Sequence, residues 1–231
     1  MKYDIEADPS FSTARVVFDE PGEEIVVEAS AMAAKDSDVE METSTRGGML
    51  QAAKRAATTG ESLFQNTFKA TEPGQTLWIS PPAEGDLQIV EMDGGDDVLF
   101  TSDNFVASGP GIEIDSSWEG AKGFFSGSSL FLGRATGSGP LFLGSYGGIH
   151  PVELDGSAEG YVVDNHHIVG FTEGLNYNVQ RMGGLMSLGD EGYVCRFRGE
   201  GTIWVSTRSP SGLADFLHPY RRTASSNEGV E

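Results

Sequence analysis

The sequence predicts an all-β protein built from three tandem copies of one hairpin module. The chain of 231 residues contains 31 glycines, well above the average usage of about 7%. Glycine at that density suits many tight turns between short strands. Two different strand motifs also recur along the chain with a shared spacing, and a hydrophobic fraction of 38% is enough to bury a core. A chain of this length is normal for a single β unit.

The first recurring motif is a glycine-containing turn followed by a short apolar strand with a central aromatic residue. The central aromatic residues are Trp78, Phe142 and Trp204, and a serine follows each strand. Their spacings are 64 and 62 residues. The motif therefore predicts one equivalent strand in each of three copies.

The second motif is an apolar strand that leads through a glycine turn into another strand. It occurs at residues 105–114 and 168–177, and a related hairpin opens the chain at residues 15–27. Gly111 and Gly174 are 63 residues apart, which is the period of the first motif. Gly22 and Gly111 are 89 residues apart, so the first copy is longer by 26 residues.

The extra length has a source in residues 36–59. The stretch 49–57 has strong helix formers and no Gly or Pro, and Gly60 is a natural stop. We expect one short inserted helix near residues 48–58, with its apolar side packed on its own β core or on a neighbouring subunit. The predicted repeats are residues 10–96, 97–158 and 159–218, which close into a single compact unit over residues 1–222. The polar tail 223–231 is expected to be disordered.

The formal net charge of −20 has two interpretations. One is a functional acidic surface that repels nucleic acid and anionic lipid. The other, favoured by the even scatter of Asp and Glu and by only five lysines, is adaptation to a salt-rich, halophilic host. On the second interpretation the charge says little about partners, because every protein of such a host shares it. We expect no nucleic-acid partner. Arg46, Lys54 and Arg55 form either a local docking patch or, more simply, a solvated helix face.

Cys195 is the only cysteine, so no internal disulfide can form, as expected in a reducing compartment. It lies in an alternating strand pattern, which favours a buried structural thiol over a nucleophile. The first residues are polar and charged, and no apolar run approaches the ~20 residues that span a bilayer. We therefore predict a cytoplasmic protein without a membrane span.

The segment Ser145–Pro151 is the first candidate for a binding or chemical site. Gly147 and Gly148 permit close backbone approach or a positive φ angle, and Pro151 holds His150 extended. The simpler interpretation is a turn that positions Tyr146 and His150 for packing. The alternative is a ligand-binding or proton-transfer role for these two side chains.

The remaining candidates for chemistry are weak. His166 and His167 are adjacent, so on a strand they point to opposite faces and cannot easily share a metal; a cupin-like site would need a different histidine spacing, although Glu173 follows. Ser145, His150 and Asp155 lack the nucleophile elbow of a hydrolase, and no phosphate-binding glycine loop occurs. We expect no catalytic residue, no cofactor and no metal, with Tyr146, Gly147, Gly148, His150 and His167 as candidate interaction residues.

Five segments, taken in order, resemble one known family. They are residues 47–50, 60–68, 145–154, 163–171 and 201–208. Together they resemble the family of the yeast altered-inheritance-of-mitochondria protein 24, a domain of unknown function, over about residues 10–218. The resemblance implies a short double-stranded β-helix related to the tryptophan RNA-binding attenuation protein (TRAP-like), present three times, and homo-oligomers that are most often trimers. It carries over no catalytic residue, and RNA binding does not follow from fold. The sequence departs from the family pattern at Asn165-His166, where members often have Pro-Gly.

Three function classes follow from these observations. The first is a non-enzymatic scaffold or interaction protein that acts as a homo-oligomer, and it is favoured. The second is a small-molecule or nucleic-acid binding module that uses the Tyr146–His150 turn or the Arg46–Arg55 patch. The third is a cupin-like metal enzyme.

Overall fold

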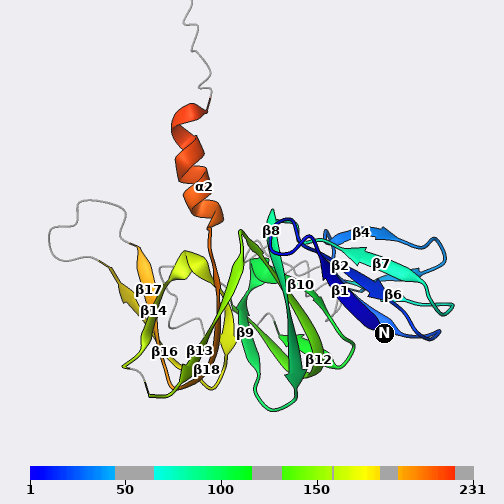
Figure 1. The fold of residues 1–231 in the computed structure, drawn as a ribbon, viewed down its shortest axis with the longest axis horizontal. Coiled ribbons are helices and arrows are strands. Elements are labelled where there is room, and N and C mark those ends of the chain that lie inside the picture. The colour runs from blue at the N-terminus through cyan, green and yellow to red at the C-terminus, as the bar shows by residue number, and fades with distance from the viewer. Residues whose placement is uncertain (45–64, 116–131, 158, 183–191, 222–231) are drawn as a thin grey trace, which may run out of the picture.

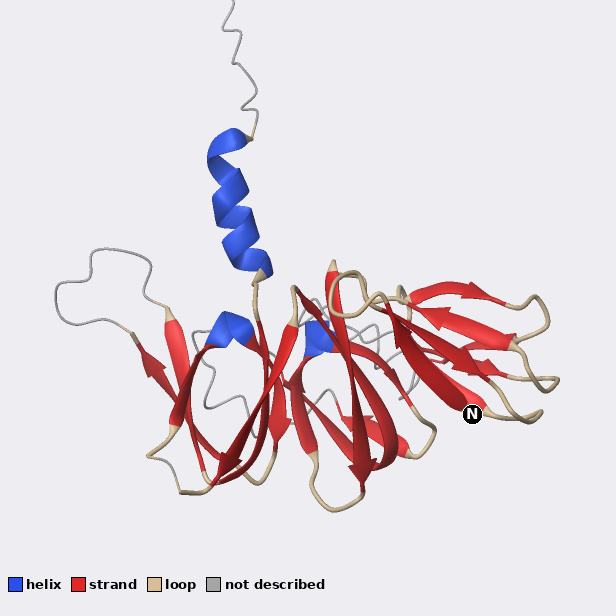
Figure 2. Cartoon of the chain, in the orientation of Figure 1, coloured by secondary structure: helices blue, strands red, loops and turns tan. Residues whose placement is uncertain are grey.

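The chain is mostly β-strand in the computed structural model, which describes residues 1–44, 65–115, 132–157, 159–182 and 192–221 (Figure 2). All pairings between its named strands are antiparallel. The predicted all-β class is therefore confirmed. Figure 1 shows the strands as a row of β layers, with the N-terminal strands at one end and the C-terminal strands at the other.

The strands fall into three groups along the chain. The first group is β1 (Lys2–Glu6), β2 (Thr13–Val17), β3 (Glu24–Glu28), β4 (Met32–Lys35), β5 (Glu40–Ser44), β6 (Gln65–Lys69) and β7 (Thr76–Ile79). The second is β8 (Gly85–Asp93), β9 (Val98–Thr101), β10 (Phe105–Ser108), β11 (Ile112–Asp115) and β12 (Leu132–Tyr146). The third is β13 (Ile149–Asp155), β14 (Tyr161–Asp164), β15 (Ile168–Thr172), β16 (Asn176–Arg181), β17 (Tyr193–Arg198) and β18 (Glu200–Ser206). The described helices are η1 (Ser102–Asn104), η3 (Asn165–His167), α2 (Pro210–Leu217) and η4 (His218–Tyr220).

The largest sheet runs through all three groups in the order β13-β18-β15-β9-β12-β10-β3-β6-β5, with β8 and β11 also paired to β12. A four-stranded sheet, β1-β2-β7-β4, and a three-stranded sheet, β14-β17-β16, lie at its two ends. Two pairings join the groups: β3 with β10, and β9 with β15. We call these two pairings the seams.

The predicted hairpins are wrong in one respect: the two strands of each do not pair with each other. β2 pairs with β1 and β7, whereas β3 pairs with β6 and β10. In the same way β10 and β11 both pair with β12. The period-2 pattern locates strands but does not identify their partners, and each predicted turn instead joins two strands that are not neighbours in the sheets.

The predicted turn at Gly137-Ser138-Gly139 is also wrong, because β12 runs through it without a break. Gly137 and Gly139 have φ angles of 102° and 129°, which an L side chain rarely adopts. Before this point β12 pairs with β9 and β11, and after it β12 pairs with β8 and β10. The two glycines therefore lie where β12 changes its neighbouring strands.

Three strand pairs share one irregularity. In β4–β7, β10–β12 and β15–β18 the register shifts by one residue just before the strand meets the central aromatic residue of the first sequence motif. The aligned pairs are Ala34 with Trp78, Ala107 with Phe142, and Gly170 with Trp204. A turn closed by one 3.1 Å N–H···O=C bond follows each pair, from Val39 to Asp36, Ile112 to Gly109 and Leu175 to Thr172. We call β4–β7, β10–β12 and β15–β18 the bulged pairs.

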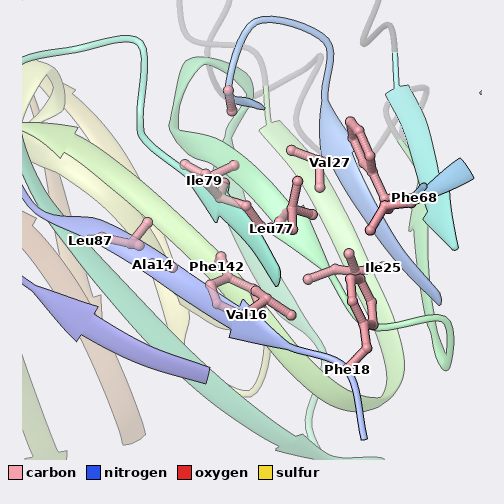
Figure 3. Close-up of a cluster of buried hydrophobic side chains, with 14 of the residues drawn as sticks. Ala14, Val16, Phe18, Ile25, Val27, Phe68, Leu77, Ile79, Leu87 and Phe142 are labelled. Atoms are coloured by element: carbon pink, nitrogen blue, oxygen red, sulfur yellow. The ribbon is translucent and has the colours of Figure 1, made fainter. Parts of the chain in front are cut away.

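The hydrophobic core consists of three clusters that cross the seams. Phe142 and Val106 of the second group are buried in the cluster formed mainly by the first group (Figure 3). Val169 and Trp204 of the third group are buried in the cluster of the second group. Each of these two clusters is therefore completed by side chains from the following group.

The helix α2 was not expected inside the predicted β repeat 159–218. Ser209 precedes it and accepts a 3.2 Å hydrogen bond from the Gly212 N–H, and Pro210 occupies the first turn, so a Ser-Pro start signal was present in the sequence. The predicted helix 48–58 and the predicted tail 223–231 lie outside the described residues. No helix in the described part of the chain is long and apolar enough to cross a membrane.

We expect Gly170→Val to lower the free energy of unfolding by ~1–3 kcal/mol, because a Cβ atom at this position would lie 2.9 Å from the Leu99 carbonyl oxygen across the seam. Urea unfolding monitored by circular dichroism measures the change. Gly174→Ala is the control, since a Cβ atom there meets nothing within 4 Å. An unchanged unfolding midpoint for Gly170→Val would contradict close seam packing.

Candidate functional site

The Tyr146–His150 turn connects β12 to β13 and is held by a buried carboxylate. Asp86, at the start of β8, is only 6% exposed. Its Oδ1 atom accepts hydrogen bonds from the Ser12 hydroxyl at 3.0 Å and the Leu87 N–H at 2.8 Å, and its Oδ2 accepts from the Ile149 N–H at 3.0 Å. A buried carboxylate needs this set of donors. Asp86 therefore ties the turn to β8 and to the loop before β2.

The glycines of this turn allow the backbones of β8 and the turn to touch. Gly85 and Gly147 form an isolated parallel bridge, and a Cβ atom on Gly85 would lie 2.1 Å from the Ser145 carbonyl oxygen. Gly147 has a φ angle of 78° and accepts a 2.9 Å bond from the Asp86 N–H. The Gly148 N–H donates to the Thr207 hydroxyl at 2.9 Å. These contacts favour the packing interpretation of the turn.

The side chains of Tyr146 and His150 lie at different depths. Tyr146 is half-buried and His150 is exposed on β13, opposite Val205 of β18. Nothing in this geometry assigns either side chain a proton-transfer partner. A ligand role for these two residues stays a prediction.

The two adjacent histidines have separate partners. His167 Nδ1 lies 2.7 Å from the Ser206 carbonyl oxygen, so the Nδ1–H tautomer donates to it. His166 Nδ1 lies 3.2 Å from an Asp164 carboxylate oxygen and is exposed. Within the described ranges, no group of three or more His, Cys, Asp or Glu residues could hold a metal ion. His167 thus joins η3 to the end of β18.

The three residues of the imagined hydrolase triad each have another partner. The Ser145 hydroxyl is buried and donates to the Gly147 carbonyl at 3.0 Å. The Asp155 carboxylate accepts from both the hydroxyl and the N–H of Ser157, and the hydroxyl holds the pKa of Asp155 below its ordinary value. His150 is exposed on the strand that ends at Asp155. This arrangement offers no activated nucleophile.

Two further ionisable groups are shifted by burial and lie in core surroundings. Cys195 is fully buried in the cluster of the third group, and this burial raises its pKa to about 12. Burial, together with a hydrogen bond to Glu91, raises the pKa of Tyr3 to about 12 as well. The Tyr3 ring packs edge-on against Phe142 at 5.4 Å between centroids. Both groups therefore remain protonated at neutral pH, as structural side chains do.

A shallow hollow lies beside the seam between β3 and β10. Its lining residues are Met1, Gly22, Glu23, Glu24 and Pro110, and its volume is about 220 Å³. Ligand pockets are commonly ~300–1,000 Å³. This hollow therefore lends no support to the small-molecule alternative.

Comparison with known proteins places the chain in a family. The family model described as mitochondrial biogenesis AIM24 matches residues 3–208. The chain belongs to this AIM24 family. The family suspected from the sequence segments is thereby confirmed, and α2 lies just beyond the matched residues.

Two proteins of Streptococcus pyogenes are similar to this AIM24 family member. An uncharacterized protein of Streptococcus pyogenes serotype M6, M6_Spy0233, is 29% identical over 184 residues, covering 78% of this chain and 72% of the relative. The crystal structure of protein SPYM3_0169 from Streptococcus pyogenes matches with a TM-score of 0.76 and 24% identity. The match covers 95% of this chain and 99% of that one, and at this identity it supports the fold alone.

Sequence reasoning missed Asp86, which is the residue that organises the candidate turn. The only available signal was an acidic residue directly after Gly85 and before an apolar strand, and solvated acidic residues are common in this chain. Its three donors come from residues up to 74 positions away. Such a constellation has no local sequence signature.

We expect Asp86→Ala to lower the free energy of unfolding by at least ~2 kcal/mol, because several buried donors lose their acceptor at once. His150→Ala is the matched control in the same turn, and its exposed side chain should change stability by no more than ~0.5 kcal/mol. Thermal unfolding in concentrated salt compares the two. Equal effects would show that the carboxylate does not hold the turn.

We expect Cys195 to react with an aromatic disulfide reagent at pH 8 only as fast as the chain unfolds, because its pKa of about 12 leaves almost no thiolate. Its raised pKa also stabilises the fold below the ordinary pKa of about 9, and that stabilisation is lost as the pH rises from about 9 to about 12. Cys195→Ala should flatten part of this decline. Fast labelling of the folded protein would contradict the buried position.

Proposed function

We propose that this AIM24 family member is a non-enzymatic scaffold or interaction protein that acts as a homo-oligomer, with a trimer as the favoured assembly. The observation that carries this proposal is a set of apolar side chains exposed on ordered elements of the surface. These are Met32, Met41, Tyr161, Val162, Leu213, Phe216, Leu217 and Tyr220. Contiguous exposed apolar groups mark surfaces that bind other macromolecules, and Leu213, Phe216, Leu217 and Tyr220 lie together on α2 and η4.

The clearest such element is α2, which projects away from the β layers in Figure 1. No residue of α2 is buried. Phe216 is 66% exposed and Tyr220, in the following η4, is 74% exposed, and their rings lie 5.9 Å apart. A short capped helix that presents aromatic rings to solvent suits recognition and not catalysis.

For the architecture we propose three copies of one TRAP-like double-stranded β-helix module over residues 10–96, 97–158 and 159–218. The three bulged pairs, with their shared turn, support this arrangement. Equivalent residues are then Ala34, Ala107 and Gly170 on one strand and Trp78, Phe142 and Trp204 on its partner. In this scheme β8 and β13 connect successive modules.

The charge and the single cysteine support a cytoplasmic role in a salt-loving host. With 35 acidic and 15 basic residues, the surface repels nucleic acid at low salt, and nothing in the described residues favours a nucleic-acid site over a protein partner. The buried, reduced Cys195 agrees with a reducing compartment.

The absolute mass in concentrated salt, measured by multi-angle light scattering, tests the assembly. We expect a stable multiple of the chain mass of 24.6 kDa, with three copies favoured. A mass of one chain at all concentrations from about 1 to 100 µM would rule out the homo-oligomer.

The non-enzymatic part of the proposal needs a separate test. We expect no reproducible turnover when the purified protein is incubated with a metabolite library. The Asp86→Ala variant, which alters the candidate turn, is the control for any activity that does occur. Turnover that this variant abolishes would overturn the proposal.

A further inference from the structure

The edge strands at the two ends of the row, β4 and β14, are largely exposed, whereas the strands at the equivalent positions along the seams are buried. All residues of β10 and β15 are buried except the last residue of β15, which is half-buried, whereas Met32, Ala33 and Ala34 of β4 are exposed. All four residues of β9 are buried, whereas Tyr161 and Val162 of β14 are exposed. The difference has one cause: β10 and β15 lie on a seam, and β4 and β14 have no neighbouring module.

The two seams share one register, so the register of a third can be read from them. Ala107 lies opposite Val27 in the first seam, and Gly170 lies opposite Phe100 in the second. Ala34 is equivalent to Ala107 and Gly170, and Val163 is equivalent to Val27 and Phe100, by their positions in the strand pairs β14–β17, β9–β12 and β3–β6. A third seam would place Ala34 opposite Val163, Lys35 opposite Val162, and Asp36 opposite Tyr161.

The residue types at the two ends of the row match those at the equivalent positions of the two seams. The third residue of each seam strand is small, as Ala34, Ala107 and Gly170, and Gly170 has room for no larger group. Phe142 and Trp204 each fill the core of the preceding group. Their equivalent Trp78 stays half-buried, with Arg15 placed 5.9 Å from its ring centroid.

The second seam also contains an ion-pair contact, and the arginine at the equivalent position in the third group has no such contact across a seam. Arg134 on β12 forms ion pairs with Asp97 at 2.6 Å and with Glu173 of the following group at 2.8 Å. Its equivalent is Arg196 on β17, by the pairs Arg134–Leu99 and Arg196–Val162. The Arg196 Nε atom is buried and has no hydrogen-bond partner.

The position equivalent to Glu173 at the other end of the row is Ser37, because Leu175 and Val39 close the same turn. Asp36 and Asp38 flank Ser37 and are exposed. A module bearing this turn would bring carboxylates to the side chain of Arg196, whose Nε atom has no hydrogen-bond partner in the single chain. The two ends thus carry opposite charges at positions that the shared register would bring together.

We propose that β4 of one copy pairs antiparallel with β14 of a second copy, which continues the seam between chains. This inference rests on the homo-oligomer of the proposed function and identifies its interface. β4 and β14 lie at opposite ends of the chain in Figure 1, so they meet in another molecule and not in the same one. Unpaired edge strands are templates for such pairing.

The lysine of β4 does not oppose the pairing. The Lys35 Nζ atom donates to the carbonyls of Asp36, Ser37 and Val39 at 2.8–3.3 Å within its own turn. Its charge is thus held at the turn and away from the free edge of β4. Because the two surfaces differ, the contact is heterologous, and it closes into a ring when the rotation between chains allows and extends as a filament otherwise.

Disulfide cross-linking tests the register. Lys35→Cys and Val162→Cys chains, carrying different tags, are co-expressed and oxidised, and the products are separated without reductant. We expect a covalent dimer with both tags, because opposite residues bring their Cα atoms within the range that a disulfide bridges. Neither variant alone should cross-link, and Met32→Cys with Val162→Cys, displaced by about 10 Å along the strand, should not. The buried Cys195 does not interfere.

A charged side chain introduced on β14 provides a second test of the β4–β14 contact. We expect Val162→Lys to reduce the mass from light scattering to that of one chain, with an unchanged circular dichroism spectrum, since Val162 is 48% exposed in the single chain. Met41→Lys is the matched control: Met41 is also 48% exposed and lies on β5, which pairs with β6 and takes no part in the proposed contact.

The outcomes separate this inference from the proposed function. An oligomer that survives Val162→Lys and gives no cross-link overturns the β4–β14 contact and leaves the homo-oligomer standing. Dissociation by a Phe216→Ser/Tyr220→Ser variant, with no effect of Val162→Lys, assigns the assembly to α2 and likewise overturns the inference. A monomeric starting protein overturns the homo-oligomer itself.

Discussion

The fold depends on strands that pair across the seams and on aromatic side chains that are buried in the core of the neighbouring group. Phe142 and Trp204 are buried in the cores of the groups that precede their own. An aromatic side chain buries ~150–250 Å², and each such burial contributes roughly 1.5–3 kcal/mol. Neither the first nor the second group closes its core alone, so the seams make one cooperative structure out of strand groups that are short by themselves.

The Tyr146–His150 turn also helps to hold the three strand groups together. Asp86 gathers donors from the loop before β2, from β8 and from the start of β13, and Thr207 extends the contact to the end of β18. A buried carboxylate with three donors is specific in geometry, because a shifted strand would leave several polar groups unpaired. The residues that first suggested a site for chemistry thus lie at the junction that fixes the three strand groups relative to one another.

The proposed function rests on surfaces and not on reactive groups. The shifted pKa values of Cys195 and Tyr3 arise from burial in the core, while the apolar groups on β4, β14 and α2 face solvent. In a chain of net charge −20, long-range repulsion between copies is strong at low salt. The proposed association between copies therefore needs salt screening, specific strand pairing and local charge contacts such as the one proposed for Arg196.

The sequence by itself determined the all-β class, the position of most strands, the recurrence of Trp78, Phe142 and Trp204, and the family. Alternation with period 2 and glycine turns are local properties, so they can be read from neighbouring residues. Tertiary structure alone decided that β2 and β3 part to different sheets, that β12 runs through Gly137 and Gly139, and that Asp86 holds the candidate turn. Strand partners and buried polar networks join residues far apart in the chain, and the alternation that places a side chain on one face of a strand does not identify the strand beside it.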